Sequence, residues 1–471
     1  MLTSLRKIIL ANTFTSILMG LTLAVYALLL SGVTASYVEA VSVCTTWPTC
    51  DGSWVIGMGD TDALIAMGHR VFSVLVGLAL LGATMWSWLR SLPPRVRWTL
   101  TGIVAIYPLQ IALGAVTVSL GGHALISALH LLVAVVIFFG TLLALLFWLE
   151  WETRDIDSSY TSSHREPSAD SRGADERAST TLRATVWAYL QLTKPRLMWL
   201  LCIVALAGMG LATVSSGIAL TWQMVVGTLL GGVLAIGASG TFNHVIERDV
   251  DHRMGRTADR PVTTGEVSAR RAIVFGVGLM LASVLVFLSL VNVIAMALAL
   301  LAIGFYSIVY TVILKPHTTQ NIVIGGAVGA LPALIGWAAV TGSIGLPAVV
   351  LGLIIFLWTP AHFYNLALAY QRDYERGGFP MLPVARGEQI THRHIVLYFG
   401  ATLVGVGMLS AVASVGWLFT ATAIMFAGIF LLAVVNLFRH RSRPAALTTF
   451  HTSNAFLGVL MLVIILETIV L

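Results

Sequence analysis

The chain has 471 residues, of which 58% are hydrophobic and only 10% are charged, and its mean hydropathy is +0.90. An average soluble domain carries about 25% charged residues, so this composition excludes soluble enzymes, disordered proteins and fibrous proteins. The formal net charge is +6, but the basic residues are spread over many loops, which argues against a nucleic-acid partner. We therefore expect an all-α, polytopic membrane protein that lies in a lipid bilayer.

Four apolar runs open the chain, each long enough for a membrane helix of about 20 residues. They cover roughly residues 8–30, 69–90, 98–118 and 125–148. Basic residues precede the first run, as in a signal peptide, but the run exceeds the ~7–15 apolar residues of a signal peptide and lacks a clear cleavage site. We therefore expect a membrane span there, and a four-span membrane domain over residues 1–149.

Two histidines of this domain are expected at similar depth in the membrane. His69 opens the second run from the outer side, and His130 lies near the outer end of the fourth. Two opposed imidazoles can hold a haem iron from both sides, so the pair predicts a haem site. His123, in the short outer loop, is a third candidate ligand. The alternative is that these histidines are structural.

Cys44 and Cys50 lie in the long outer loop of this domain. The outer compartment is oxidising, so the two thiols are expected to form a disulfide or to act as a redox-active pair. The whole chain has three cysteines, which is too few for a disulfide framework.

Residues 150–189 separate the first four runs from nine more. This stretch is rich in Ser, Asp, Glu and Arg and poor in aliphatic residues, so we expect a polar cytoplasmic linker. A second membrane domain follows over residues 190–471. Its apolar runs cover roughly 197–217, 223–245, 272–290, 292–313, 321–341, 346–366, 394–416, 418–438 and 448–470.

The basic residues predict which side of the membrane each loop faces. If the N-terminus faces the cytoplasm, every lysine and arginine except Arg70 falls on the cytoplasmic side. This asymmetry is the positive-inside rule. We therefore expect a multi-pass protein of the cell membrane, with its N-terminus and charged loops in the cytoplasm and its C-terminus outside.

The most informative segment is NHVIERDVDHRMGRTADRP, which begins where the sixth run meets the cytoplasm. Asn243, Glu247 and Asp251 are four residues apart, so on a helix their oxygens lie on one face. Mg²⁺ binds carboxylates together with substrate phosphate oxygens, and guanidinium groups suit phosphates. Three arginines follow: Arg253, Arg256 and Arg260. The segment predicts a metal–diphosphate site, against the alternative of a charged helix end whose groups pair with one another.

A second cytoplasmic loop, LWTPAHFYNLALAYQRDYERGGFPMLPVARGE, supplies Asp373 and would place a second acidic site opposite the first. Between the two loops, the segment YSIVYTVILKPHTTQNIVIGG carries Tyr306, Tyr310 and Lys315. Tyrosine rings can stabilise an allylic cation by cation–π attraction. Anchoring at the membrane interface explains tyrosines at this depth equally well.

Four separate motifs resemble the haem-directed branch of the UbiA-type intramembrane prenyltransferases, the protohaem IX farnesyltransferases. They are LTKPR, NHVIERDVDHRMGRTADRP, YTVILKPHTTQNIVIGG and DYERGGFPMLPV. The resemblance covers essentially all of residues 190–471. It implies Mg²⁺-assisted transfer of farnesyl from farnesyl diphosphate to a vinyl group of haem B. Water then completes a hydroxyethylfarnesyl side chain, which gives haem O.

The resemblance also assigns residues to roles. The catalytic and metal-binding group would be Asn243, Glu247, Asp251 and Asp373 as metal ligands, with Lys315 and Tyr310 beside them. The diphosphate group would be Lys194, Arg253, Arg256 and Arg260. Wider members of the superfamily carry a second carboxylate where this chain has Gly377, and this departure favours a haem acceptor over a quinone-type aromatic acceptor.

His362 lies deep in the tenth run, close to the second cytoplasmic loop. An ionisable group inside a span is a functional candidate, and this one could ligate or orient the haem or help to deliver water. A histidine that packs in the core is an equally good interpretation.

The first domain resembles one four-helix half of haem A synthase through CTTWPTCDG, GHRVFS and LGAVTVSLGGHALISALH. That family carries a catalytic glutamate three residues before the His-Arg pair, where this chain has Ala66. The resemblance therefore implies haem binding, and it leaves open whether the domain oxidises haem O or only binds haem.

The leading prediction is an enzyme that makes haem O for haem–copper terminal oxidases, with Mg²⁺ as cofactor. Its protein partners would be haem A synthase or assembly factors of those oxidases. A second possibility is a prenyltransferase with a quinone-precursor or lipid acceptor, whose first domain is a non-catalytic haem-binding module. A haem carrier or membrane b-type cytochrome would need histidine pairs but no diphosphate site, so the segment 243–260 argues against it.

Overall fold

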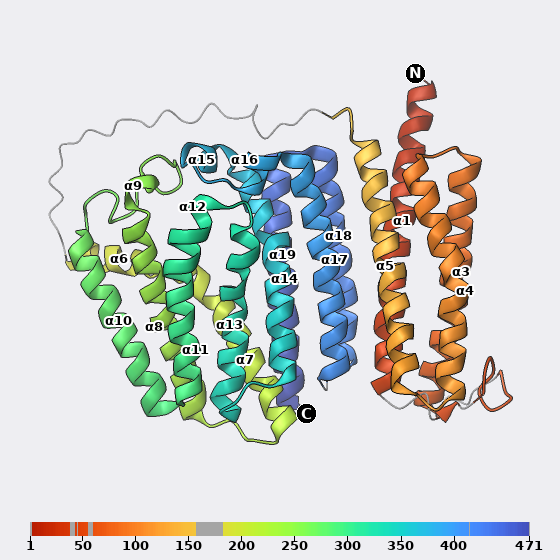
Figure 1. The fold of residues 1–471 in the computed structure, drawn as a ribbon, viewed down its shortest axis with the longest axis horizontal. Coiled ribbons are helices and arrows are strands. Elements are labelled where there is room, and N and C mark those ends of the chain that lie inside the picture. Colours follow the sequence, from red (N-terminus) through yellow and green to blue (C-terminus); the bar gives the residue numbers. More distant parts are fainter. Residues whose placement is uncertain are drawn as a thin grey trace. The chain divides into compact units, whose positions relative to one another are not determined.

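The structure, a computed structural model, describes residues 2–37, 43–44, 46–54, 60–156, 182–413 and 415–470. Within these ranges the regular structure is helical, apart from one isolated bridge between Cys50 and Ser53 (Figure 1). Thirteen of the described helices are long and apolar enough to cross a membrane. The expected all-α, multi-pass membrane protein is therefore confirmed.

The chain divides into two compact units. The first unit comprises Met1–Ile156 with Val406–Arg439, and the second comprises Asp157–Gly405 with His440–Leu471. Only the two ends of the expected linker are described, because residues 157–181 lie outside the described ranges. The domain boundaries expected at residues 149 and 190 stay a prediction.

Four long helices form the N-terminal part of the first unit: α1 (Leu2–Tyr37), α3 (Thr61–Leu89), α4 (Pro94–Ser119) and α5 (Ala124–Glu152). Helix α3 begins eight residues before the apolar run that predicted it. Asp60 causes this early start, because its side chain accepts a hydrogen bond of 3.0 Å from the backbone N–H of Ala63 and caps the first turn. Hydropathy finds the apolar centre of a helix, whereas the cap decides where the helix begins.

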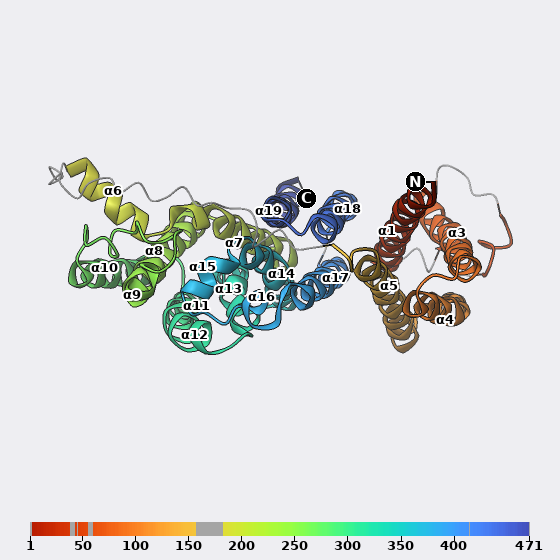
Figure 2. The same ribbon diagram turned by 90° about the horizontal axis from the view of Figure 1, so that it is seen from above.

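The second unit holds the remaining helices except α18 (Trp417–His440), nearly all of which belongs to the first unit. Its long helices are α7 (Pro195–Ser216), α8 (Trp222–Ile246), α10 (Ala269–Leu290), α11 (Val293–Gly304), α13 (Asn321–Thr341), α14 (Leu346–Ala369), α19 (Arg443–Val470) and most of α17 (Glu388–Val412). Its short helices are α6 (Leu182–Leu192), α9 (Arg248–Asp251), α12 (Lys315–His317), α15 (Gln371–Arg376) and α16 (Leu382–Arg386). Figure 2 looks along the long helices of this unit.

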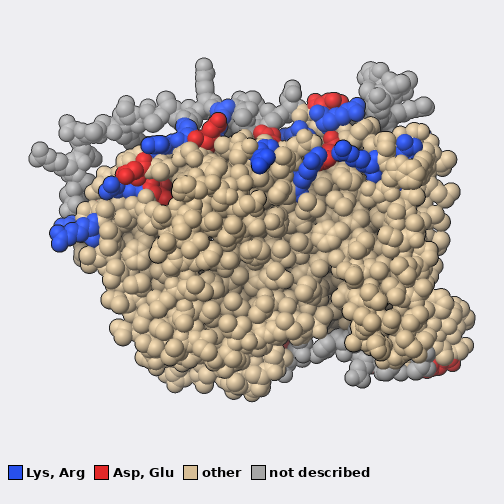
Figure 3. Space-filling model, viewed as in Figure 1, with Lys and Arg blue, Asp and Glu red and all other residues tan. Residues whose placement is uncertain are grey.

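The short helices α9, α15 and α16 lie at one end of the second unit (Figure 1). Lysine, arginine, aspartate and glutamate side chains gather at the same end, and the rest of the visible surface of this unit is almost free of charge (Figure 3). A bilayer core disfavours charged groups, so this distribution fits helices that cross the membrane with their charged loops on one side.

Two backbone features of the second unit shape its interior. A π-helix, η1 (Phe305–Leu314), continues α11, and the N–H of Lys315 at its end donates to the carbonyl of Tyr310, five residues back. Helices α7 and α13 approach so closely that a Cβ atom at Gly208 or Gly336 would overlap the backbone of the facing helix. Small residues allow such crossings inside membranes.

Candidate functional site

Three buried polar side chains lie where α8 ends. Asn243, Glu247 and Asp251 are 2%, 4% and 0% exposed. Helix α8 formally ends at Ile246, yet the N–H of Glu247 still donates to the carbonyl of Asn243 and that of Asp251 to Glu247, at 2.9 and 2.8 Å. The helical path therefore continues through the break. The three residues consequently keep the shared face that their spacing predicts.

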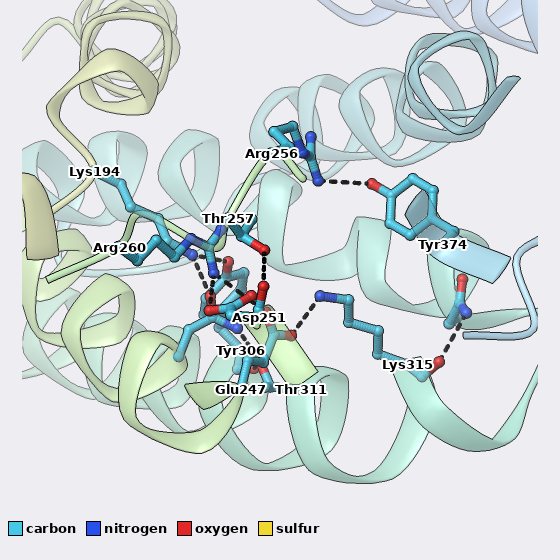
Figure 4. Close-up of polar contacts among 12 residues, drawn as sticks. Lys194, Glu247, Asp251, Arg256, Thr257, Arg260, Tyr306, Thr311, Lys315 and Tyr374 are labelled. Carbon is cyan, nitrogen blue, oxygen red and sulfur yellow. Dashed lines mark hydrogen bonds and ion pairs between the residues drawn. The ribbon is translucent and has the colours of Figure 1, made fainter. Parts of the chain in front are cut away.

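Basic side chains from two segments pair with the two carboxylates (Figure 4). Lys315, which follows η1, forms an ion pair with Glu247. Arg260 Nη1 lies 2.6 Å from Asp251 Oδ2 and 3.7 Å from Glu247 Oε2, so one guanidinium bridges both carboxylates. A buried charge is costly unless it is paired, and these contacts supply the partners. The other oxygen of Asp251, Oδ1, is buried without a hydrogen-bond partner.

Lys194 brings a third cation to the same place. Its Nζ donates to Asn243 Oδ1 and, at 3.2 Å, to the hydroxyl of Tyr306. The backbone of Lys194 has φ 56° and ψ 55°, a left-handed conformation that is unfavourable for a lysine. Pro195 follows at the first position of α7. Such strain persists where the surrounding structure requires it, and here it places Lys194 at the site.

Burial and neighbouring charges shift the pKa values of Glu247, Asp251 and Lys194. Burial alone would raise the pKa of the Glu247 carboxyl, but Lys315 and Lys194 hold it below its usual value. Burial raises the pKa of Asp251 above its usual value, against the effect of Arg260. Burial and the nearby Arg260 lower the pKa of Lys194 to about 7. The cations outnumber the carboxylates here, so an anionic ligand would relieve their repulsion.

The second cytoplasmic loop lies against the first. Arg256 Nη2 donates to the hydroxyl of Tyr374 at 3.2 Å, and its guanidinium lies 5.0 Å from the ring centre of Tyr370. Asp373 pairs with Arg376 at 2.5 Å, and a Cβ atom on Gly255 would lie 3.7 Å from the Asp373 carboxylate. The two charged loops therefore lie against each other.

Among the described residues, no three His, Cys, Asp or Glu side chains form a group that could hold a metal ion. The structure thus does not bring Asp373 together with Glu247 and Asp251, because Asp373 faces Arg376 instead. The remaining donors, two carboxylates and the amide oxygen of Asn243, still fit Mg²⁺, which takes one or two carboxylates together with phosphate oxygens. The unpartnered Asp251 Oδ1 is a free ligand atom for such an ion.

The other expected residues of this site fall in two groups. Tyr310 stacks on Tyr306 with ring centres 5.6 Å apart, so both rings lie at the site. Arg253 is exposed, and no described contact joins it to the cluster. His362 stacks between Trp358 and Phe450, each 4.2 Å away. Its Nδ1 lies 2.7 Å from the hydroxyl of Ser453, so its surroundings are those of a packed core histidine.

An apolar cavity of about 130 Å³ adjoins the charged site. Lys194 and Tyr306 line it, together with residues of α7, α8, α11 and α13. On α7 the lining runs from Leu197 to Ala205, which is where the backbones of α7 and α13 come together beside Gly336. The arrangement suits an amphiphile with an anionic head at the cluster and a hydrocarbon chain in the cavity.

His69 and His130 line a second cavity, of about 670 Å³, in the first unit. Each imidazole packs against a glycine of the preceding helix: Cβ atoms at Gly32 and Gly114 would lie 3.0 and 3.1 Å from the Cε1 atoms of His69 and His130. His130 Nδ1 is buried without a hydrogen-bond partner. His123 is the exposed N-cap of α5 and does not line the cavity. The predicted pair therefore shares one cavity, and the third candidate lies outside it.

Arg70, the one basic residue expected on the outer side, organises the loop beside this cavity. Its guanidinium donates to the backbone carbonyls of Cys44, Thr46, Pro48 and Thr49, at 2.7–3.2 Å. A disulfide joins Cys44 to Cys50 across the same loop. Main-chain carbonyls leave no signal in a sequence, so this role of Arg70 could not be predicted.

Two family models match the chain. The UbiA prenyltransferase family matches residues 200–460, and a family of cytochrome oxidase assembly proteins matches residues 3–138 and 58–193. A protoheme IX farnesyltransferase of Halobacterium salinarum is 48% identical over 98% of this chain and 99% of its own. One of Natronomonas pharaonis is 50% identical over 97% of this chain and 98% of its own.

A solved structure of a UbiA homologue from Archaeoglobus fulgidus, bound to DMAPP and Mg²⁺, is also similar to this chain. It is 18% identical, with a TM-score of 0.47, and the match covers 59% of this chain and 99% of that one.

Proposed function

Because the chain belongs to the UbiA prenyltransferase family, we propose that this multi-pass membrane enzyme transfers farnesyl from farnesyl diphosphate to a vinyl group of haem B. The observation that carries the proposal is the buried cluster of Lys194, Arg260 and Lys315 around two carboxylates, beside an apolar cavity. A diphosphate head group requires cations around it, and a prenyl tail requires an apolar cavity. The farnesyltransferase relatives, similar over nearly the whole chain, support the choice of donor and acceptor.

The chemical step breaks the bond between C1 of the farnesyl group and the diphosphate oxygen, and the electron pair leaves with the diphosphate. Lys194, Arg260 and Lys315 stabilise the negative charge that develops on the leaving group. Mg²⁺, held by Asn243, Glu247 and Asp251, would add positive charge at the same oxygens. The cluster is buried, and this strengthens each of these interactions.

We assign the stabilisation of the positive charge on C1 to two tyrosines. The stacked rings of Tyr306 and Tyr310 lie beside the cluster, and in this proposal their faces attract the cationic C1 without reacting with it. The vinyl carbon of haem B then bonds to C1, and the cation moves to the carbon next to the porphyrin. Water adds there and releases a proton, which completes the hydroxyethylfarnesyl side chain.

For the first unit we propose haem binding between His69 and His130. Their shared cavity of about 670 Å³ and the match to cytochrome oxidase assembly proteins support this proposal. Ala66 supplies no carboxylate, so the activity of a haem A synthase is not part of the proposal. If this unit receives haem O from the second unit, that transfer would explain why both units occur in one chain.

The sidedness of the charges supports a placement in the cell membrane with the diphosphate site facing the cytoplasm. Water-soluble farnesyl diphosphate head groups would reach the cluster from that side. The partners would be the substrates, the bilayer and assembly factors of haem–copper oxidases.

The test is mass spectrometry of haems extracted from a host that lacks its own haem O synthase and haem A synthase and expresses the full chain. Haem O is the expected product. Haem A in addition would show that the first unit is active despite Ala66. Haem B alone, with the protein correctly inserted and farnesyl diphosphate present, would contradict the proposal and favour a quinone-precursor or lipid acceptor.

A further inference from the structure

We propose that Thr311 is a positioning residue, which fixes the orientation of the Asn243 side chain so that its amide oxygen faces the metal–diphosphate site. The inference deepens the proposed function, because it rests on the role of Asn243 as a ligand. Thr311 lies in η1, which belongs to a different span from Asn243, and its side chain is only 4% exposed.

The orientation of the Asn243 side-chain amide follows from the hydrogen bond that the Thr311 hydroxyl donates. Thr311 Oγ1 donates its single hydrogen to the carbonyl of Tyr306 at 2.8 Å. Only lone pairs then remain on this oxygen. Asn243 Nδ2 lies 3.2 Å from it and donates to them. The nitrogen of the amide must therefore face Thr311, and its oxygen must face the opposite way.

On that opposite side, Asn243 Oδ1 accepts a hydrogen bond from Lys194 Nζ. If the amide were turned by 180°, its NH₂ group would face the ammonium of Lys194 and its oxygen would face the lone pairs of Thr311. Both hydrogen bonds would be lost in a buried place, where unpaired polar groups are costly. Thr311 and Lys194 together hold the amide in one orientation, and only Thr311 remains to do so when Lys194 turns to a bound diphosphate.

The π-helix makes this arrangement possible. In α-helices of this protein, threonine hydroxyls such as those of Thr241 and Thr449 donate to the carbonyl four residues back. Thr311 instead reaches the carbonyl of Tyr306, five residues back, in the wider turn of η1. The hydroxyl therefore donates its hydrogen to a backbone carbonyl and accepts a hydrogen bond from Asn243 with its lone pairs. π-helical turns occur frequently at functional sites.

The experiment measures metal binding rather than turnover. Mn²⁺, a paramagnetic substitute for Mg²⁺, is titrated into the full-length protein in the presence of an unreactive thio-analogue of farnesyl diphosphate, and free Mn²⁺ is followed by electron paramagnetic resonance. Thr311→Val keeps the shape of the side chain and removes the hydroxyl, so it should weaken Mn²⁺ binding by roughly tenfold. Thr311→Ser keeps the hydroxyl and should stay within about twofold of the wild type.

A second background separates positioning from packing. Asn243→Asp presents an oxygen in either orientation of the group, so it needs no partner to choose between them. In that background Thr311→Val should change Mn²⁺ binding by less than about twofold. A merely structural role would weaken binding equally in both backgrounds, and that outcome would overturn the proposal. Mn²⁺ binding by Thr311→Val that equals the wild type would overturn it as well.

The same titration distinguishes this inference from the proposed function. If the wild type makes haem O and binds Mn²⁺ but Thr311→Val binds equally well, only the role of Thr311 fails. If the wild type binds no Mn²⁺ with the analogue present, the metal site at Asn243 fails and Thr311 fails with it. The haem O assay decides separately whether the proposed reaction is correct.

Discussion

At the scale of single residues, Asp251 is the carboxylate whose loss should matter most. It is fully buried, bound to Arg260 through one oxygen and without a partner on the other. Asp251→Asn removes the negative charge that would bind a metal ion, so we expect prenyl transfer to fall by about a hundredfold or more while the protein still inserts. Haem O formation in membranes is the measurement.

The neighbouring Asp249 supplies the matched control. It is exposed and pairs with the adjacent Arg248, so Asp249→Asn makes the same chemical change two residues away. Its activity should remain within about twofold of the wild type, since surface ion pairs contribute little. Full activity in Asp251→Asn would contradict the assignment of the metal site.

Tyr374 provides a second prediction at this scale. Its hydroxyl accepts a hydrogen bond from Arg256, and sequence reasoning assigned it no role. Tyr374→Phe keeps the ring and frees the guanidinium, so we expect the KM for farnesyl diphosphate to rise about threefold to tenfold with little change in kcat. Steady-state kinetics would show this, with Tyr398→Phe in α17 as a control. A fall in kcat at constant KM would indicate another role.

The sequence reveals a candidate residue when its partners lie nearby in the chain. The four-residue spacing of Asn243, Glu247 and Asp251 predicts their common face, and the structure has it. The cations that pair with them come from segments up to 68 residues away, as Lys315 does from Glu247. No periodicity links such positions, and only the resemblance to a family assigned roles to Lys194 and Lys315. No sequence pattern indicated the role of Thr311 or the four backbone carbonyls that accept hydrogen bonds from Arg70.

At the scale of helices, hydropathy was sufficient to predict all the membrane spans found among the described residues. Spans are predictable because a bilayer demands a long apolar run. The ends of helices are less predictable, because polar capping residues determine where a helix begins, as Asp60 does for α3. The π-helix η1 could not be predicted, since its sequence FYSIVYTVIL reads as an ordinary apolar helix.

The crossing of α7 and α13 leads to a prediction about stability. A Cβ atom at Gly336 would overlap the carbonyl of Ala205, so Gly336→Ala must force the two backbones apart. We expect a loss of about 1–3 kcal/mol, which thermal unfolding in detergent would detect. Gly278→Ala in α10 is the control, because its Cβ would meet nothing within 4 Å and its stability should not fall. An unchanged melting temperature in Gly336→Ala would show that the crossing is less tight.

At the scale of the whole molecule, the chain combines a prenyltransferase with a part that matches cytochrome oxidase assembly proteins. The two cavities differ in a way that suits this combination. One is small, apolar and next to a cluster of cations, and the other is large and lined by two histidines. A product made at the first would be a ligand for the second if the proposed reaction is correct.

Spectroscopy of the full chain tests the second cavity. His69→Ala removes one of the two proposed axial ligands, so the absorption bands of a haem held by two histidines should be lost. His123→Ala changes a histidine outside the cavity and should leave these bands unchanged. Reduced-minus-oxidised spectra of the purified protein provide the measurement. Identical spectra for His69→Ala and the wild type would refute the proposal of two histidine ligands.

The π-helix has a consequence for the kinds of mutation that this protein can accept. A π-turn holds more residues than an α-turn, so deletion of one residue from η1 would let α-helical bonding return. In an α-helical turn the hydroxyl of Thr311 would bond to the carbonyl four residues back, as those of Thr241 and Thr449 do, and the five-residue bond to Tyr306 would be lost. By contrast, Ile308, Val312 and Ile313 are largely exposed and should tolerate other apolar side chains. The length of this segment, more than its composition, is what the protein must preserve.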